Sequence, residues 1–431
     1  MVPAMISTPH SSLFLSACVA LLLASGCATT TPPQIAPSDP VEALRFDVAY
    51  LASDLLEGRQ PGTPGEALAA DYIARRFAEV GLTPGGDDGG WTQPFTFQVS
   101  TNPHGGGETV SMNARNVIGV LDRGAAETIV VGAHYDALGY GGMGSRAPGE
   151  EAIHNGADDN ASGTAALFAI AERLVASNAQ ARNVVFVAFS GEEMGLHGSK
   201  YFVSTLEGME GTTVAYMLNL DMVGRLADTK DSEAENGVLA VNGVGTSPAW
   251  GAALDAVAEA TGLTLARTES GLGPSDHASF YLADIPVLHF FTGQHTDYHT
   301  PVDDSHLIDY EGLATVADFA VRVIEDLDDD AAIAFTKTQD QSQRSMSFRV
   351  GLGVMPDYVF TGEGMRIDAV LSDRAAERAG LQDGDVVVRL GDTDITDIQT
   401  YMEALSSFDV GDAAPIIVER DGERVEATVQ F

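Results

Sequence analysis

The sequence is poor in basic residues, and above all in lysine. Its 431 residues include 23 lysines and arginines against 62 aspartates and glutamates, a formal net charge of −39 at pH 7. Lysine occurs only at positions 200, 230 and 337. A chain this acidic repels phosphate backbones and anionic lipid, so the composition disfavours a nucleic-acid-binding function. A surface so acidic and poor in lysine indicates either a salty habitat or an acidic secreted protein.

Cysteine and long apolar runs are also scarce. The longest N-terminal apolar run, residues 13–23, is too short to span a bilayer but has the length of a signal-peptide core. It leads through small residues into Cys27, which resembles the lipobox of bacterial lipoproteins. Lipidation of Cys27 is therefore expected, with an ordinary cleaved signal as the alternative. Because Cys18 lies in the removed segment, no internal disulfide is expected.

Export is the expectation that follows. Ala28 after the cysteine lacks the aspartate that resembles an inner-membrane retention signal, which favours the periplasmic side of the outer membrane or the cell surface. The Thr/Pro-rich residues that follow resemble a tether. We predict a signal peptide over 1–26 and a tether over 27–40.

The rest of the chain has the composition of a folded protein, with 45% hydrophobic and 20% charged residues. Short β-like runs alternate with helical patterns, which predicts an α/β domain over 41–328 with a mixed, mostly parallel sheet flanked by helices. The expected strands are 116–121, 128–133, 183–189, 214–220, 238–241 and 286–290, and the main helices are 162–177, 248–261 and 310–327. A polar linker is predicted over 329–345, and a small β-rich domain over 346–431.

Potential metal-binding residues follow the predicted strands, where active sites of such sheets gather. They are His134 and Asp136 in "AHYD", Asp158 and Asp159 in "GADDNASG", Glu192 and Glu193 in "SGEE", Asp221 in "NLDMVG", and His295 and His299 in "HTDYHTPVDD". Each alone has a structural explanation, such as a helix cap for Asp159 or a satisfied imidazole for His295. Together they predict a metal site.

The residue types narrow the chemistry. Imidazoles and carboxylates without a thiolate suit a pair of divalent ions such as zinc, although cobalt or manganese would also fit. Two ions lie about 3.5–4 Å apart when a carboxylate bridges them, and they activate a shared water. Of the adjacent Glu192 and Glu193, one can bind metal while the other accepts the proton of that water. Asp136 is expected to orient the imidazole of His134.

These motifs resemble the co-catalytic zinc peptidase family that includes bacterial leucyl aminopeptidases, glutamate carboxypeptidases and glutaminyl cyclases. The resemblance covers roughly residues 41–327 and implies two Zn²⁺ ions per chain. Its implied roles are His134 and Asp221 on one zinc, Glu193 and His299 on the other, Asp158 as the bridge, Asp159 after the bridge through a cis peptide, Glu192 as general base, Tyr298 as oxyanion stabiliser and Asp303 behind His299.

Two further segments have open roles. His277 in "SDHASF" matches a family motif and is expected to have a structural or pocket role, with an additional metal ligand as the alternative. The glycine-rich residues 138–151 lie between two predicted ligands and are either a mobile rim or a passive surface loop.

The C-terminal segment resembles a bacterial PDZ domain of the kind attached to periplasmic proteases. The resemblance lies in residues 364–395, an apolar run, an Ala-rich helix, the turn "AGLQDGD" and a second apolar run. "VGLGV" at 350–354 occupies the place where such domains bind a peptide carboxylate, which implies a peptide or protein C-terminus as partner. A module that only packs on the catalytic domain is the alternative.

An exported di-zinc aminopeptidase is the leading hypothesis for function. A carboxypeptidase or deacylase on the same fold is an alternative, as is a glutaminyl cyclase. The resemblance implies for a glutaminyl cyclase a site with one zinc, which lacks part of this ligand set. A non-enzymatic tether that recruits partners through the PDZ-like module is a further alternative, disfavoured by the intact ligands and by Glu192.

Overall fold

The computed structural model describes residues 36–100, 109–142, 144–147, 149, 151–206, 213–228, 236–328, 333–338, 350–357, 360, 362–371, 374–420 and 422–431. The predicted signal peptide, Cys27 and most of the tether lie outside these residues. Within them, no helix combines the length and hydrophobicity that a membrane span requires.

The large domain is built on a mixed sheet, most of whose central strands are parallel. Its strands run in the order β1-β3-β5-β4-β6-β9-β7-β8, with β2 paired to β3. Their bounds are β1 Thr83–Pro84, β2 Thr92–Ser100, β3 Thr109–Leu121, β4 Glu127–His134, β5 Asn183–Phe189, β6 Thr213–Leu220, β7 Val238–Asn242, β8 Thr264–Thr268 and β9 Val287–Phe291. β5, β4, β6 and β9 are parallel neighbours, so their carboxyl ends share one edge. The predicted fold class is confirmed.

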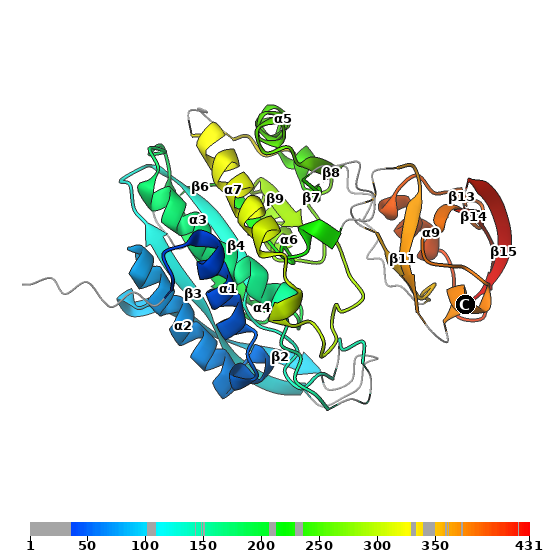
Figure 1. Ribbon diagram of the computed structural model, residues 1–431, viewed down its shortest axis with the longest axis horizontal. Coiled ribbons are helices and arrows are strands. Elements are labelled where there is room, and N and C mark those ends of the chain that lie inside the picture. Colours follow the sequence, from blue (N-terminus) through cyan, green and yellow to red (C-terminus); the bar gives the residue numbers. More distant parts are fainter. Residues whose placement is uncertain are drawn as a thin grey trace, which may run out of the picture. The chain divides into compact units, whose positions relative to one another are not determined.

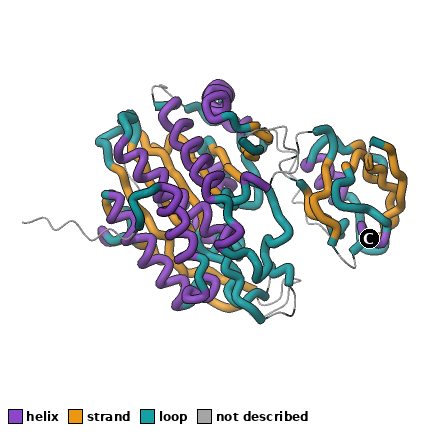
Figure 2. The backbone as a smooth tube through the Cα atoms, in the orientation of Figure 1, coloured by secondary structure: helices purple, strands orange, loops and turns teal. Residues whose placement is uncertain are grey.

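Helices cover both faces of this sheet (Figures 1 and 2). One layer contains α1 Pro40–Leu51, α2 Pro64–Val80, α3 Gly163–Ala176, α5 Trp250–Thr261 and α7 Tyr310–Asp326. The other contains α4 His197–Leu206 and α6 His277–Tyr281. Alternate residues of β4 face the two layers: Ile129 and Val131 join the first core, and Val130 joins the second. A central strand buried on both faces explains the continuous apolar run of β4.

Local capping fixes where the long helices begin and end. Asp39 accepts the first free N–H groups of α1, Thr63 does the same for α2, and Asp309 for α7. α2 ends at Gly81, whose φ of +99° is left-handed. Short helical turns connect the elements: η1 Asp54–Arg59, η2 Asp87–Gly89, η3 Ala157–Ser162, η4 Leu226–Asp228, η5 Val244–Thr246 and η6 Ser305–Leu307.

The C-terminal domain is a small antiparallel sheet with two helices. Its strands run in the order β10-β11-β12-β14-β15, with β13 paired to β12. Their bounds are β10 Val354–Pro356, β11 Met365–Val370, β12 Val386–Leu390, β13 Thr393–Asp394, β14 Ala413–Arg420 and β15 Glu423–Gln430, and the helices are α8 Ala375–Arg378 and α9 Ile398–Leu405. β10 lies at the end of the strand order, so one of its edges is unpaired within the described sheet.

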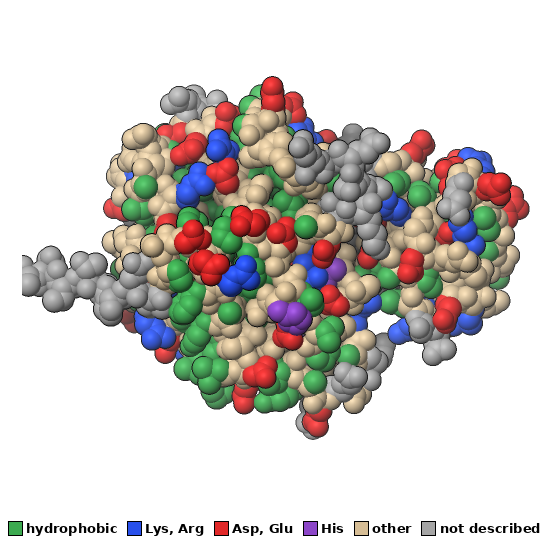
Figure 3. Space-filling view, in the orientation of Figure 1, with side chains coloured by type: hydrophobic (Ala, Val, Ile, Leu, Met, Phe, Trp, Pro, Cys, Tyr) green, Lys and Arg blue, Asp and Glu red, His purple; other side chains and the backbone are tan. Residues whose placement is uncertain are grey.

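On the face that Figure 3 shows, acidic side chains are scattered rather than gathered in one patch. Their number there fits the composition, with 62 acidic against 23 basic residues.

Part of the predicted linker packs on the large domain. Ile333 belongs to the main hydrophobic core, and the ring of Phe335 lies 5.6 Å from that of Tyr281 on α6. The N–H of Thr336 donates to the carbonyl of Thr246 at 2.7 Å, and the Tyr281 hydroxyl lies 2.9 Å from the Thr338 hydroxyl. Residues 333–338, which we call the strap, therefore extend the large domain beyond α7.

We predict that Ile333→Ala destabilises the large domain by about 2–5 kcal/mol, because it deletes a buried side chain and leaves a cavity. Lys337→Ala, in the same strap but exposed, is the matched control and should change stability by less than about 0.5 kcal/mol. Denaturant unfolding of the full chain measures both. Equal stability of the two variants would show that the strap does not contribute to the core.

Candidate metal centre

The predicted site residues meet at the carboxyl edge of the sheet, because several of them directly follow one of the parallel strands. His134 ends β4, Glu192 and Glu193 follow β5, and Asp221 follows β6. His299 lies in the loop after β9. The shared direction of these strands brings residues up to 165 positions apart in the sequence to one place.

Two groups of possible metal ligands share one carboxylate. The first group is His134, Asp159 and Asp221, and the second is Asp159, Glu193 and His299. In the first, Nε2 of His134 lies 3.2 Å from Oδ1 of Asp159 and 3.3 Å from Oδ1 of Asp221. In the second, Nε2 of His299 lies 3.1 Å from Oδ2 of Asp159 and 3.0 Å from Oε2 of Glu193. Asp159 thus directs one oxygen to each group.

This placement differs from the prediction, which gave the bridging position to Asp158. The fully buried carboxylate of Asp158 instead accepts the N–H of Gly224 at 2.7 Å and lies 3.2 Å from Nε2 of His295. Its oxygens are therefore engaged away from both groups. The cis peptide is likewise one residue later than expected, between Asp159 and Asn160.

Asp303 also has a different place from the expected one behind His299. Its carboxylate accepts the backbone N–H groups of Asp158 and Asp159, at 3.0 to 3.1 Å. It holds the segment that carries the bridging carboxylate. Burial, together with repulsion by the Asp158 carboxylate, raises the pKa of Asp303 to about 6.

Asp136 lies beside the imidazole of His134, which it is expected to orient. Its Oδ1 is 3.6 Å from Nδ1 of His134, and its backbone carbonyl is 3.2 Å from the same nitrogen. The same Oδ1 accepts the backbone N–H of Glu192 at 3.2 Å. One buried carboxylate therefore positions both the imidazole of His134 and the backbone of Glu192.

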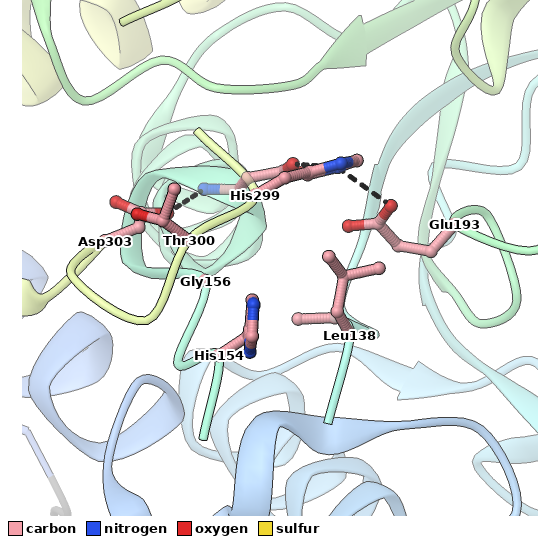
Figure 4. Close-up of a pocket in the computed structure, with 9 residues that line it drawn as sticks. Leu138, His154, Gly156, Glu193, His299, Thr300 and Asp303 are labelled. Atoms are coloured by element: carbon pink, nitrogen blue, oxygen red, sulfur yellow. Dashed lines mark hydrogen bonds and ion pairs between the residues drawn. The ribbon is translucent and has the colours of Figure 1, made fainter. Parts of the chain in front are cut away.

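The two glutamates after β5 diverge. Glu193 points at His299, as Figure 4 shows, with Leu138 and His154 on the other side of the same pocket. Burial and the neighbouring Asp159 raise the pKa of Glu193 to about 7, although His299 opposes the shift. Burial also raises the pKa of Glu192 well above its usual range, with His134 opposing and Asp221 and Glu193 adding to the shift. A raised pKa lets a carboxylate accept a proton more readily, which suits a general base.

Tyr298 packs directly on a predicted ligand. Its ring stacks on the imidazole of His299, with centroids 3.8 Å apart and planes 20° apart. Burial and the surrounding carboxylates raise the pKa of its hydroxyl above the usual value, so the phenol stays protonated at neutral pH. Tyr298 can therefore donate a hydrogen bond, as the predicted role requires.

His277 belongs to neither group of possible ligands. It is fully buried and stacks on His289, with centroids 4.5 Å apart. Burial and the neighbouring His289 lower the pKa of His277 well below its usual value, which keeps the ring neutral. The preceding Asp276, which sequence reasoning passed over, is buried too, and burial raises its pKa to about 7.

Sequence reasoning also missed Arg59, a fully buried guanidinium in the turn-rich "EGRQPG" segment. It donates to four backbone carbonyls, those of Leu51, Tyr135, Asn155 and Gly156. Tyr135 directly follows His134, and Asn155 and Gly156 lie three and two residues before Asp158. The available signal was an arginine among the glycines and prolines of a turn, where its five N–H donors can bind the backbone carbonyls of neighbouring loops.

The donor set suits divalent metal. Each group offers one imidazole and two carboxylates whose ligand atoms lie within 4.8 Å of one another. Oε1 of Glu193 is buried without a hydrogen-bond partner among the described residues. Neutral imidazole and carboxylate are the ligands that zinc takes in catalytic sites. The residues therefore fit a pair of zinc ions, with Asp159 between them. A centre of this kind suits metal-assisted hydrolysis.

Comparison with known proteins identifies similar families for both domains. Residues 116–324 match the family model described as "Peptidase family M28", and residues 333–431 match the model described as "PDZ domain". Residues 116–324 are thus similar to M28 peptidases, and residues 333–431 are similar to PDZ domains.

Curated relatives include the aminopeptidase YwaD of Bacillus subtilis, 28% identical over 223 residues, which are 50% of this chain and 45% of that protein. Leupeptin-inactivating enzyme 1 of Streptomyces exfoliatus is 26% identical over 287 residues, 66% of this chain and 56% of that one. The chain spans about half the length of these relatives. Among solved structures, the Porphyromonas gingivalis glutaminyl cyclase shares the fold, with a TM-score of 0.53 and 20% identity over 66% of this chain and 98% of that chain.

Two adjacent substitutions test which aspartate serves both groups. Asp159→Asn should remove zinc from both, because each group uses one of its oxygens. Asp158→Asn should keep the bound zinc and cost about 1–3 kcal/mol of stability through its buried hydrogen bonds. Zinc content after dialysis, measured beside unfolding, gives the answer. The reverse pattern, with zinc lost in Asp158→Asn and kept in Asp159→Asn, would contradict the assignment.

Proposed function

We propose that this chain is an exported di-zinc aminopeptidase, which releases N-terminal residues from peptides. The observation that carries the proposal is the pair of ligand groups that share Asp159. Two such groups support a centre with two ions, whereas the alternative glutaminyl cyclase resembles a one-zinc site. The similarity to an aminopeptidase over half of the chain supports the choice of reaction.

Two bound zinc ions would lower the pKa of an attacking water and polarise the scissile carbonyl. The chain's own residues supply the rest. Glu192 takes the proton from the attacking water on its carboxylate and returns it to the leaving amine. Asp136 holds the backbone N–H of Glu192 and the imidazole of His134, which keeps the base and the ligand in register. The protonated hydroxyl of Tyr298 donates to the developing oxyanion.

Peptides are the proposed partners of both domains. The first domain takes them as substrates, and the PDZ domain is proposed to bind a peptide or protein C-terminus, which would add as a strand beside β10. We further propose that the chain works on the periplasmic side of the outer membrane or at the cell surface, held by a lipid on Cys27. The apolar run before Cys27 and the small residues that join them support this location.

The activity is tested with a panel of peptides, each supplied with a free and an acetylated N-terminus, on zinc-loaded mature protein. Release of N-terminal residues from the free-amine peptides alone is the expected result. Glu192→Gln should lower kcat by roughly 10²–10⁴-fold, because the proton acceptor is lost. Glu259→Gln, an exposed glutamate on α5, is the control and should leave kcat unchanged.

The other outcomes separate the alternatives. Release from the C-terminus, or cleavage that ignores acetylation, would replace the aminopeptidase with a carboxypeptidase or a deacylase. Loss of ammonia from N-terminal glutamine without hydrolysis would identify a glutaminyl cyclase.

A further inference from the structure

The glycine-rich segment between two ligand-bearing loops makes specific contacts with the metal centre. We call it the rim, and its described residues are 138–142, 144–147 and 149. At its base, Gly139 pairs with His154 in an antiparallel bridge, in which the N–H of His154 donates to the carbonyl of Gly139 at 2.7 Å. Gly139 also donates its N–H to the carbonyl of Gly58 at 3.0 Å. The base of the rim is therefore fixed to the domain.

The rim then reaches across to His299. The carbonyl of Gly144 lies 2.9 Å from Nδ1 of His299, and a carbonyl can only accept, so Nδ1 carries the proton. The other nitrogen, Nε2, is left with its lone pair toward Asp159 and Glu193. Arg146 adds a backbone contact, since its N–H donates to the carbonyl of His299 at 2.9 Å. These contacts matter because His299 has a left-handed φ of +57°, unusual for a residue other than glycine.

A second histidine holds this part of the rim. His154 is 2% exposed and lines the same pocket as His299 (Figure 4). Its Nδ1 lies 2.9 Å from the carbonyl of Ala152 and donates to it, so in the neutral ring Nε2 accepts a hydrogen bond from the Ser145 hydroxyl, at 2.8 Å. Ser145 directly follows Gly144. The contact is close enough that a Cβ on Gly141 would lie 2.6 Å from Cε1 of His154.

The two groups of ligands are thus oriented by unlike means. In the first group, Nδ1 of His134 faces Asp136, which follows the same strand. In the second group, Nδ1 of His299 faces the backbone carbonyl of Gly144, and the next residue, Ser145, is hydrogen-bonded to His154. The hydrogen-bond partner of a ligating imidazole typically changes metal affinity by about 10–100-fold. Only the second group contacts the rim in this way among the described residues.

We propose that Ser145 and His154 are positioning residues that set the zinc affinity of the second group, through the Gly144 carbonyl and His299. This inference rests on the proposed metal centre. It goes beyond the proposed reaction, because it makes one of two metal positions depend on the rim while the other does not.

Zinc binding to the full chain tests the proposal without reference to activity. In Ser145→Ala, titration of the metal-free protein against a chelator of known affinity should show one zinc equivalent bound about 10-fold or more weakly and the other unchanged. Ser145→Thr keeps the hydroxyl and should restore binding to within about 3-fold of the unsubstituted chain, well inside that 10–100-fold range. Ser204→Ala, at an exposed serine on α4, is the matched control. Two equivalents with unchanged affinities in Ser145→Ala would overturn the proposal.

Single-group backgrounds identify which zinc is affected. With Asp221→Asn the second group remains, and adding Ser145→Ala should weaken the remaining zinc. With Glu193→Gln the first group remains, and adding Ser145→Ala should have no effect. Equal weakening in both backgrounds would indicate a general structural role and contradict the proposal. If a background binds no zinc, the two-step titration of Ser145→Ala alone decides.

A double substitution adds a check on the pathway. His154→Ala and Ser145→Ala both remove the Ser145–His154 hydrogen bond, and Ser145→Ala also removes the one that the N–H of Ala147 donates to the Ser145 hydroxyl. The two substitutions should therefore weaken the affected zinc by less than the sum of their separate effects. Additive effects would refute a shared route. Failure here remains distinct from failure of the proposed function: two tightly bound zinc ions without peptidase activity would reject the function and leave the rim assignment standing on the titrations.

Discussion

Repulsion among closely placed carboxylates is the constraint on which the rest of the large domain depends. Asp136, Asp159, Glu192, Glu193 and Asp221 all gather at one edge of the sheet with two imidazoles between them. Burial removes the water that would screen them, and this is why the pKa values of Glu192 and Glu193 are raised. A divalent metal would relieve this repulsion and would leave one carboxylate free to act as a base.

Buried arginines and backbone N–H groups around the site partly offset this negative charge. Burial lowers the pKa of Arg59 to about 10, with the nearby acids opposing, so the guanidinium remains charged at neutral pH. It binds backbone carbonyls rather than any carboxylate, and so fixes the loops without competing for the ligands. Arg225 lies 3.2 Å from Asp297 in the loop after β9. The backbone N–H groups of Asp158 and Asp159 donate hydrogen bonds to the carboxylate of Asp303. These contacts involve groups other than the proposed metal ligands, so the carboxylate oxygens of the ligands stay available for metal.

Sequence patterns were sufficient for the central strands and long helices, because burial on both faces imposes continuous apolar runs such as that of β4. They also located the site, since its residues follow those strands. They could not separate Asp158 from Asp159: both are acidic, adjacent and buried, and only the path of the chain through η3 decides which side chain faces the imidazoles. The Gly144 carbonyl was invisible for a different reason, because every residue type offers one. The strap escaped notice since a single buried Ile333 carries little pattern in a polar stretch.

The fold alone does not choose the reaction. The same architecture occurs in a glutaminyl cyclase, with a TM-score of 0.53, so the sheet and its helices are compatible with chemistry other than hydrolysis. The sheet fixes the spacing of the strand ends, and hence the backbone positions of His134, Glu193 and Asp221. The loops then determine whether both groups are complete, because Asp159 and His299 come from segments with no regular strand partner. Loops such as these are therefore where proteins that share the fold can differ in chemistry.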